Sequence, residues 1–421
     1  MAIGNSSPAI SYALAPALAR DIDGRQQRNK VPSQPRSAGL SLQALLRTTH
    51  EWTAIIVAIP LLFIVVTGIF LQLRKPVEWI QPAAEKGVAR YDPQLLPADV
   101  LDAVKTVPEM KVESWDDILL LDYRPKKGII KVRNPGHFET QIDAKTGAIL
   151  KSGQRWNDIV MRLHDGSAIG MQYWLFLPVS FLTMYLLISG FYLAVKTTAR
   201  KMRLQASRRR SRRSARKNGK PVTVRKKPFD FATFCRRYHY WLAVLVIFPW
   251  FIVVCSGIVL QLRDQIPEVL PELKQGSSTN PTITYAHVLA VAKSIPEMEI
   301  RDWPDIWRVY TYPTKGVMTV RTKRNLMAQI DSTTGEVLDV SPRSADFWED
   351  VHEGIFGRHQ PYSMKLFGGS KVTLALTLFL PVHILAVLLW FTGVYFVLKT
   401  RLGTRRGHGQ SSVSSRSTGI Q

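Results

Sequence analysis

The stretch Arg47-Thr-Thr-His-Glu-Trp52 leads directly into an apolar run that ends near Leu73. The chain uses this arrangement twice, because Arg236-Arg-Tyr-His-Tyr-Trp241 precedes a second apolar run of the same length. Aligned without a gap, the two stretches place His50 on His239. The other matched positions are Trp52 with Trp241, Pro60 with Pro249, Gly68 with Gly257, and Gln72-Leu-Arg74 with Gln261-Leu-Arg263. Each half of the chain therefore has a histidine at the start of an apolar run.

The apolar residues of this 421-residue chain gather in four blocks, at about residues 52–73, 173–195, 240–262 and 372–398. Each block reaches the roughly 20 residues that cross a hydrocarbon core. None of them has an Asp, Glu, Lys or Arg in its interior. The sequence therefore predicts an α-helical membrane protein with four spans, whose first partner is the lipid bilayer.

The net charge of +24 is unevenly distributed along the chain. Lys and Arg outnumber Asp and Glu by 6 to 3 in residues 1–52, by 17 to 1 in 196–237 and by 5 to 0 in 399–421. The two long segments 75–171 and 263–371 are balanced, at 14 to 14 and 13 to 14. This alternation is the positive-inside pattern and predicts that both termini and the central loop are cytoplasmic. Topology and lipid contact account for the basic run, so no nucleic acid partner is expected.

The two long balanced segments contain matching elements. A helical pattern is followed by strand-like runs, and Asp-x-x-Thr-Gly then predicts a hairpin turned at Gly147 or Gly335. The matched pairs are 97–107 with 285–295, 128–133 with 316–321, and 141–150 with 329–338. One helix on a small antiparallel sheet, present twice, is the simplest interpretation.

A further shared stretch precedes the second and fourth spans. Residues 155–166 align with 343–354, which places His164 on His352. The spans that follow match at Ser189-Gly-Phe-Tyr and Thr392-Gly-Val-Tyr, and the second half has about 15 extra residues before its last span. One matched position differs in chemistry, because Ser180 corresponds to His383.

These patterns predict the following organisation. The segments are a cytoplasmic tail at 1–46, spans at 47–74, 172–196, 238–263 and 372–398, outer α+β domains at 75–171 and 264–371, a basic cytoplasmic loop at 197–237, and a cytoplasmic tail at 399–421.

As a set, these features resemble the PepSY-associated transmembrane family. They are the His-x-Trp before a Gly-containing span, the Asp-x-x-Thr-Gly hairpin, the His-Asp/Glu-Gly element, and the final Ser/Thr-Gly-x-Tyr span. The resemblance covers about residues 47–400. It implies four spans in two tandem repeats, each with a periplasmic PepSY-like domain, in the bacterial inner membrane.

Members of the family resemble ferric-siderophore reductases that carry two haems between four spans. The resemblance thus implies an oxidoreductase that uses two haem b groups to pass electrons across the membrane to periplasmic Fe(III), bound to a siderophore or another chelate. The chain has no Gly-x-Gly-x-x-Gly or Walker A run, so the electron donor is expected to be a separate quinol or cytoplasmic reductase. Two cysteines exclude an iron–sulfur cluster of four thiolates, and no catalytic residue is assigned.

Within this family framework His50 and His239 are expected to ligate an inner haem. A single histidine beside a tryptophan would be an ordinary interfacial anchor, but two at one register favour a ligand pair. His383 lies about 11 residues into the last span, where a polar ring is costly and marks function. Its alternative role is a hydrogen bond to Thr67 or Ser256.

The outer haem is expected to use ligands from among His164, His352 and His383. His164 and His352 stand at the opposite end of the spans from His50, so they cannot ligate the inner haem across roughly 30 Å of hydrocarbon. The preferred outer pair is His383 with His164, since it joins the two halves, and His352 would face the substrate. The alternative for His164 and His352 is a helix-ending histidine.

Two other functions remain possible at this point. A non-enzymatic PepSY protein could bind a peptide or regulate a partner, but such a protein has no use for an intramembrane histidine. A transporter is disfavoured because the spans lack an acidic residue for ion coupling.

Overall fold

The computed structural model describes residues 41–218, 229–355 and 375–411. From Leu46 onward, the described residues form one compact unit. Four of its helices are long and apolar enough to cross a membrane. They are α2 (Leu42–Leu73), α5 (Leu177–Lys217, preceded by the π-helical turn Gln172–Phe176), α6 (Phe231–Gln261) and α10 (Leu380–Ser411, preceded by Ala375–Phe379). The predicted multi-pass membrane protein is confirmed.

The second long helix extends beyond the span that the sequence predicted. α5 continues to Lys217, so residues 197–217 of the predicted loop 197–237 are helical. The segment is rich in Ala, Leu, Arg and Lys, which are strong helix formers, and it has no Gly or Pro before Gly219. The end of the apolar block marks the end of the span but not the end of the helix.

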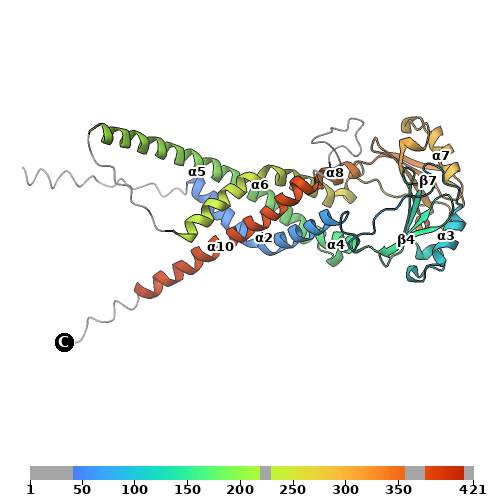
Figure 1. Cartoon of the computed structure of the whole chain (residues 1–421), viewed down its shortest axis with the longest axis horizontal. Coiled ribbons are helices and arrows are strands. Elements are labelled where there is room, and N and C mark those ends of the chain that lie inside the picture. The colour runs from blue at the N-terminus through green and yellow to red at the C-terminus, as the bar shows by residue number, and fades with distance from the viewer. Residues whose placement is uncertain (1–40, 219–228, 356–374, 412–421) are drawn as a thin grey trace, which may run out of the picture. The chain divides into compact units, whose positions relative to one another are not determined.

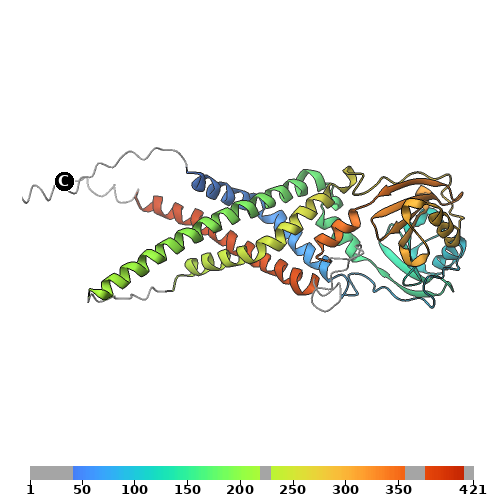
Figure 2. The same cartoon turned by 90° about the horizontal axis from the view of Figure 1, so that it is seen from above.

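The four long helices pack alongside one another (Figures 1 and 2). α6 lies against both α5 and α10. A cluster of apolar side chains from α2, α6 and α10 packs between these helices; its buried members are Val65, Val246, Trp250, Val382 and Ala386. The indole Nε1 of Trp390 donates a hydrogen bond of 2.7 Å to the Ala58 carbonyl, which ties α10 to α2.

The eight strands in the described part of the chain form one antiparallel sheet with the order β4-β3-β2-β1-β5-β6-β7-β8. The first four strands are β1 (Leu120–Arg124), β2 (Ile129–Arg133), β3 (Phe138–Asp143) and β4 (Ile149–Gln154). The others are β5 (Ile306–Tyr312), β6 (Val317–Thr322), β7 (Leu326–Asp331) and β8 (Val337–Pro342). The predicted hairpins are present, with Gly147 and Gly335 at φ +79° and +81° in the turns.

The sheet differs from the two separate small sheets that the sequence suggested. β1 pairs with β5 through Leu121–Thr311, Asp122–Tyr310 and Tyr123–Val309, so the two groups of strands are continuous. This pairing removes two exposed strand edges, which would otherwise present unpaired backbone groups. Helices α3 (Pro97–Lys105) and α7 (Tyr285–Ser294) contribute to one hydrophobic core with residues from both groups.

The core joins the groups through aromatic contacts. The ring of Tyr123 on β1 lies 4.7 Å from that of Tyr285 on α7 and 5.2 Å from that of Trp303, centre to centre. All three side chains are buried. Period-2 alternation in β1 and β2 directs apolar residues such as Tyr123 toward the helices and leaves charged residues for the opposite face of the sheet.

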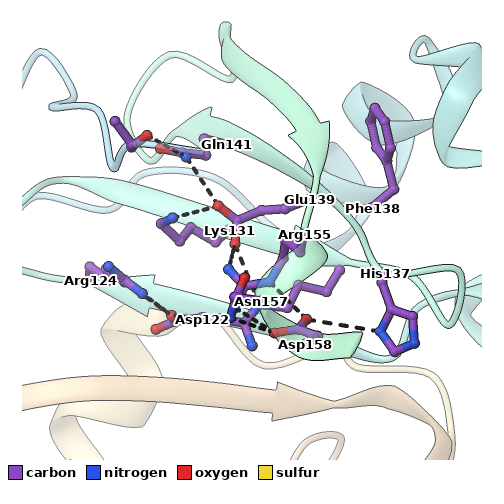
Figure 3. A network of polar contacts seen from close by, with 12 residues as sticks. Asp122, Arg124, Lys131, His137, Phe138, Glu139, Gln141, Arg155, Asn157 and Asp158 are labelled. Carbon is purple, nitrogen blue, oxygen red and sulfur yellow. Dashed lines mark hydrogen bonds and ion pairs between the residues drawn. The ribbon is translucent and has the colours of Figure 1, made fainter. Parts of the chain in front are cut away.

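That opposite face carries a buried polar network (Figure 3). Lys131 Nζ donates to Glu139 Oε1 at 2.5 Å, and both side chains are fully buried. Arg155 also donates to Glu139 and, at 2.8 Å, to Asp158. Arg155 immediately precedes α4 (Trp156–His164), so the network anchors the start of this helix. α8 (Ala345–His352) follows the last strand in the same way.

Candidate functional site

The short helix α4 places His164 against the first long helix, α2. Its Nδ1 lies 3.0 Å from Thr67 Oγ1 and 3.0 Å from the Ile64 carbonyl oxygen. Its Cε1 packs over Gly68, where an added Cβ would approach it to 3.3 Å. A hydroxyl and the neighbouring glycine thus form a seat for the ring.

α8 places His352 on α6 in the same manner. Its Nδ1 lies 3.2 Å from Ser256 Oγ and 2.9 Å from the Val253 carbonyl oxygen. An added Cβ at Gly257 would come within 3.0 Å of the ring's Cε1. The second hydroxyl–glycine seat is therefore tighter than the first.

Two further seats hold the histidines that open the sequence pattern. His50 Nδ1 lies 2.8 Å from Ser189 Oγ on α5, and a Cβ at Gly190 would be 3.2 Å from its Cε1. His239 Nδ1 lies 2.9 Å from Thr392 Oγ1 on α10, and the distance at Gly393 would be 3.4 Å. We call these four arrangements the histidine cradles: Thr67-Gly68, Ser189-Gly190, Ser256-Gly257 and Thr392-Gly393.

The hydrogen bonds of the cradle hydroxyls decide which ring nitrogen carries the proton. Each hydroxyl donates to a carbonyl of its own helix, at 2.7 to 2.8 Å. A hydroxyl has one proton, so it can only accept from the histidine. The carbonyls of Ile64 and Val253 also accept only. Nδ1–H is therefore the donor in each cradle, and Nε2 keeps its lone pair, as a metal ligand requires.

The cradles lie at two levels along the helices. On α2, His50 and Thr67 are 17 positions apart, and on α6 His239 and Ser256 are also 17 positions apart. At 1.5 Å per residue this places the levels about 25 Å apart. His50 and His239 belong to one level, and His164 and His352 belong to the other.

A cavity of about 170 Å³ lies at the level of His164 and His352. Both rings line it, and their centres are 6.1 Å apart with an angle of 61° between their planes. Two imidazoles that bind one metal ion from opposite sides, each with a metal–nitrogen bond of about 2 Å, would have their ring centres about 6 Å apart. The two rings are therefore close enough together that both could be ligands of the same metal ion.

His383 also lines the cavity, from α10. It is 7% exposed, its Nδ1 lies 2.7 Å from the Phe379 carbonyl oxygen, and its ring centre is 6.3 Å from that of Trp250. Thr67 and Ser256, the partners considered for it above, bind His164 and His352 instead. Its Nε2 also keeps its lone pair, because a carbonyl accepts at Nδ1.

Charged residues also line the cavity. Arg74 Nη2 lies 2.5 Å from Glu353 Oε1, and Arg263 Nη1 lies 3.8 Å from Glu349 Oε1. Burial raises the pKa of Glu349. Burial and then the neighbouring His352 lower the pKa of His164 to about 3. Burial likewise lowers the pKa of His352, so both rings are neutral near pH 7.

The sequence interpretation found the histidines but missed their cradles. A Ser/Thr-Gly pair occurs in each of the four spans, at 67, 189, 256 and 392. In the first and third spans the pair stands 17 residues after the histidine. That recurrence is a signal that the sequence alone contains.

These residues fit a planar cofactor with two axial ligands better than a bare metal ion. Within the described residues, no group of three or more His, Cys, Asp or Glu side chains is arranged to hold a metal ion. The cradles instead supply histidines with fixed tautomers, and the second nitrogen of each is hydrogen-bonded, as is usual for metal-ligating histidine. Neutral imidazole is an axial ligand of haem.

The helices and the site define a multi-pass membrane protein with paired histidines at two levels of its spans. Residues 47–218 match the family model described as the PepSY-associated TM region, so this part of the chain is similar to that family. The match extends from α2 to α5 and confirms the predicted resemblance over residues 47–218. A search of curated proteins finds no match.

Proposed function

We propose that the protein is a haem b electron carrier that reduces ferric iron, bound to a siderophore or another chelate, outside the inner membrane. The single observation that carries this proposal is the set of four histidine cradles. Each presents a neutral imidazole with Nδ1–H engaged and Nε2 available. Histidines that served only as interface anchors or helix caps would not need the same ring nitrogen protonated and the same ring nitrogen available.

The proposed outer ligands are His164 and His352. Their ring spacing of 6.1 Å favours this pair over His164 with His383, which the sequence argument preferred. The proposed inner ligands are His50 and His239, which approach from α2 and α6. Each pair takes one histidine from each half of the chain, so two haem groups would join the proposed repeats.

Haem would supply one-electron chemistry at both levels, and the chain's own side chains would set its conditions. The cradle hydroxyls orient the imidazoles and hold the proton on Nδ1. A hydrogen bond at that nitrogen raises ligand basicity, which is one means of tuning a metal site. Gly68 and its counterparts allow each ring to lie close to the helix backbone.

In this proposal His383 is not an axial ligand. It lines the same cavity from the fourth span, where the matching residue of the second span is Ser180. A buried imidazole with an unprotonated Nε2 can accept or deliver a proton through hydrogen bonding. Its role would be to exchange a proton beside the outer pair as the charge there changes.

The proposed orientation places both termini and the basic end of α5 in the cytoplasm. The segments 75–171 and 264–371 would then be periplasmic PepSY-like domains in one shared sheet. The charge asymmetry supports this orientation, because the excess of Lys and Arg lies on alternate segments. The donor would be a quinol or a cytoplasmic reductase.

A visible spectrum of the purified full-length protein tests the proposal. Protein expressed with adequate haem should show a Soret band that shifts on reduction by dithionite, with close to two haem groups per chain. A Fe(III) chelate added to the reduced protein should restore the oxidised spectrum. Protein without a Soret band would refute the proposal and favour a peptide-binding or regulatory role.

A further inference from the structure

The polar face of the sheet contains two groups of arginines in matching positions, but only one group has its full set of carboxylates. In the first group Arg133 on β2 stands directly across from Glu139 on β3. Glu139 is fully buried and contacts three cations, Lys131 at 2.5 Å, Arg133 at 3.5 Å and Arg155 (Figure 3). This carboxylate is the centre of the network.

The second group repeats the arginines 188 positions later. Arg321 on β6 stands directly across from Met327 on β7, as Arg133 stands across from Glu139. Arg343 occupies the place of Arg155. Its backbone N–H donates to the Asn325 carbonyl at 2.7 Å, just as the N–H of Arg155 donates to the His137 carbonyl at 2.8 Å. The central carboxylate is thus replaced by a thioether.

This replacement removes a carboxylate from the arginines; in the first group Arg133 Nε, which also makes no hydrogen bond among the described residues, lies 3.5 Å from Glu139 Oε2. Asp346 contacts both Arg321, at 3.8 Å, and Arg343, and it corresponds to Asp158 in the first group. The Nε atoms of Arg321 and Arg343 are nevertheless buried with no hydrogen-bond partner among the described residues. The two residues are 8% and 6% exposed. Asp346 is the carboxylate that contacts both guanidinium groups, and the charge of Glu349 also acts on Arg343, whereas the first group has the central Glu139 as well.

Neighbouring side chains complete the surroundings of these donors. The guanidinium of Arg321 stacks on the Tyr310 ring at 4.0 Å and donates to Tyr312 Oη at 3.4 Å. Thr319, which replaces Lys131, has a fully buried hydroxyl oxygen with no partner in the described part of the chain. A stacked guanidinium, a second guanidinium and a hydroxyl are the donors that recognise a small planar anion.

We propose that Arg321, Arg343 and Thr319 form a binding site for a carboxylate ligand, which supplies the charge that Glu139 supplies in the first group. The ligand is a small monocarboxylate or the carboxylate end of a larger molecule. A carboxylate is favoured over a phosphate because the first group satisfies the same arginine geometry with one planar carboxylate of the chain itself. The proposal is independent of haem.

Titration of the full-length protein with sodium acetate tests this proposal, with sodium chloride at equal ionic strength as the reference. The wild-type protein should bind one acetate by isothermal titration calorimetry and should unfold at a higher temperature in acetate. Met327→Glu restores the internal carboxylate, so it should abolish acetate binding and raise the unfolding temperature without ligand. Met327→Gln is the matched uncharged control and should bind acetate as the wild type does.

Arg321→Gln provides a second test and should weaken acetate binding at least tenfold. Arg324→Gln, an exposed arginine three positions away, should leave it unchanged. Equal acetate binding by wild type and Met327→Glu would overturn the proposal. Absence of acetate binding to the wild type would overturn it too. Tighter binding of inorganic phosphate than of acetate would refute the assignment to carboxylates.

Discussion

The cradle glycines differ in their distance from the histidine ring above them. This difference predicts that Gly→Ala substitutions in the four cradles change stability by different amounts. A Cβ at Gly257 would lie 3.0 Å from Cε1 of His352, whereas a Cβ at Gly393 would lie 3.4 Å from Cε1 of His239. The second distance is an ordinary contact and the first is not. Gly257→Ala must therefore displace His352 by about 0.4 Å, the difference between these distances, while Gly393→Ala needs no displacement.

The size of the effect follows from two opposing terms. Alanine is more favourable than glycine in a helix interior by about 1 kcal/mol. Overpacking of a well-packed site typically costs about 1–3 kcal/mol. The displacement at Gly257 would also lengthen the Ser256 Oγ–Nδ1 bond, now 3.2 Å, beyond hydrogen-bonding range. Gly393→Ala should therefore raise the free energy of unfolding by about 1 kcal/mol, and Gly257→Ala should lower it by up to about 2 kcal/mol.

Thermal unfolding of the two variants in the same detergent measures these effects, and the haem-to-protein ratio shows whether the outer site is affected. If displacement of His352 reduced the binding free energy of the proposed haem by about 1.4 kcal/mol, the haem affinity would fall about tenfold. Gly393→Ala is the matched control, since it changes the same residue in the same kind of seat. Equal stability and equal haem content of the two variants would refute the argument from ring contact.

Three further predictions concern the histidines, the buried network and the topology. His50→Ala and His239→Ala should each remove about one haem per chain while leaving the protein in the membrane; full haem in the double variant would make them simple anchors. Burial alone would raise the pKa of Glu139, but Arg155 and Lys131 lower it to about 2. Ionised Glu139 therefore contributes roughly 3 kcal/mol to the free energy of unfolding above pH 4.5, and this contribution is lost as the pH falls toward 2. In Glu139→Gln the free energy of unfolding should depend less on pH between pH 4.5 and 2. The same pH dependence as in the wild type would contradict the role given to Glu139. A reporter fused after Lys315 should be outside the cell membrane and one at Ser214 inside, whereas an outside signal at Ser214 would overturn the charge argument.

The parts of the fold that could be predicted from sequence are those set by local pattern. Four uninterrupted apolar blocks of this length predict four spanning helices, since a helix satisfies all of its backbone hydrogen bonds within its own segment in lipid. The Asp-x-x-Thr-Gly turn requires a residue that tolerates positive φ, and Gly147 supplies it. Both signals depend only on residues close together in the chain.

The parts that could not be predicted depend on contacts between distant residues. The pairing of β1 with β5 joins Leu121 to Thr311, and neither strand indicates which neighbour its edge will take. The position of His164 above Gly68 is set by the direction of α4, which follows from the anchoring of Arg155 in the sheet. The preference for His383 as the partner of His164 stays a prediction; it rested on depth along one helix, which does not determine the distance between rings.

The pairing of β1 with β5 has a mechanical consequence. Transport by alternating access usually requires one repeat to rock as a rigid body against the other around a fixed site. Here β1 and β5 continue one hydrogen-bonded sheet, and Tyr123 and Tyr285 lie in its shared core. Rocking of α2 and α5 against α6 and α10 would strain that ladder and expose that core. The sheet therefore holds the two pairs of spans at a fixed separation, and the two proposed haem groups would keep a constant distance for electron transfer.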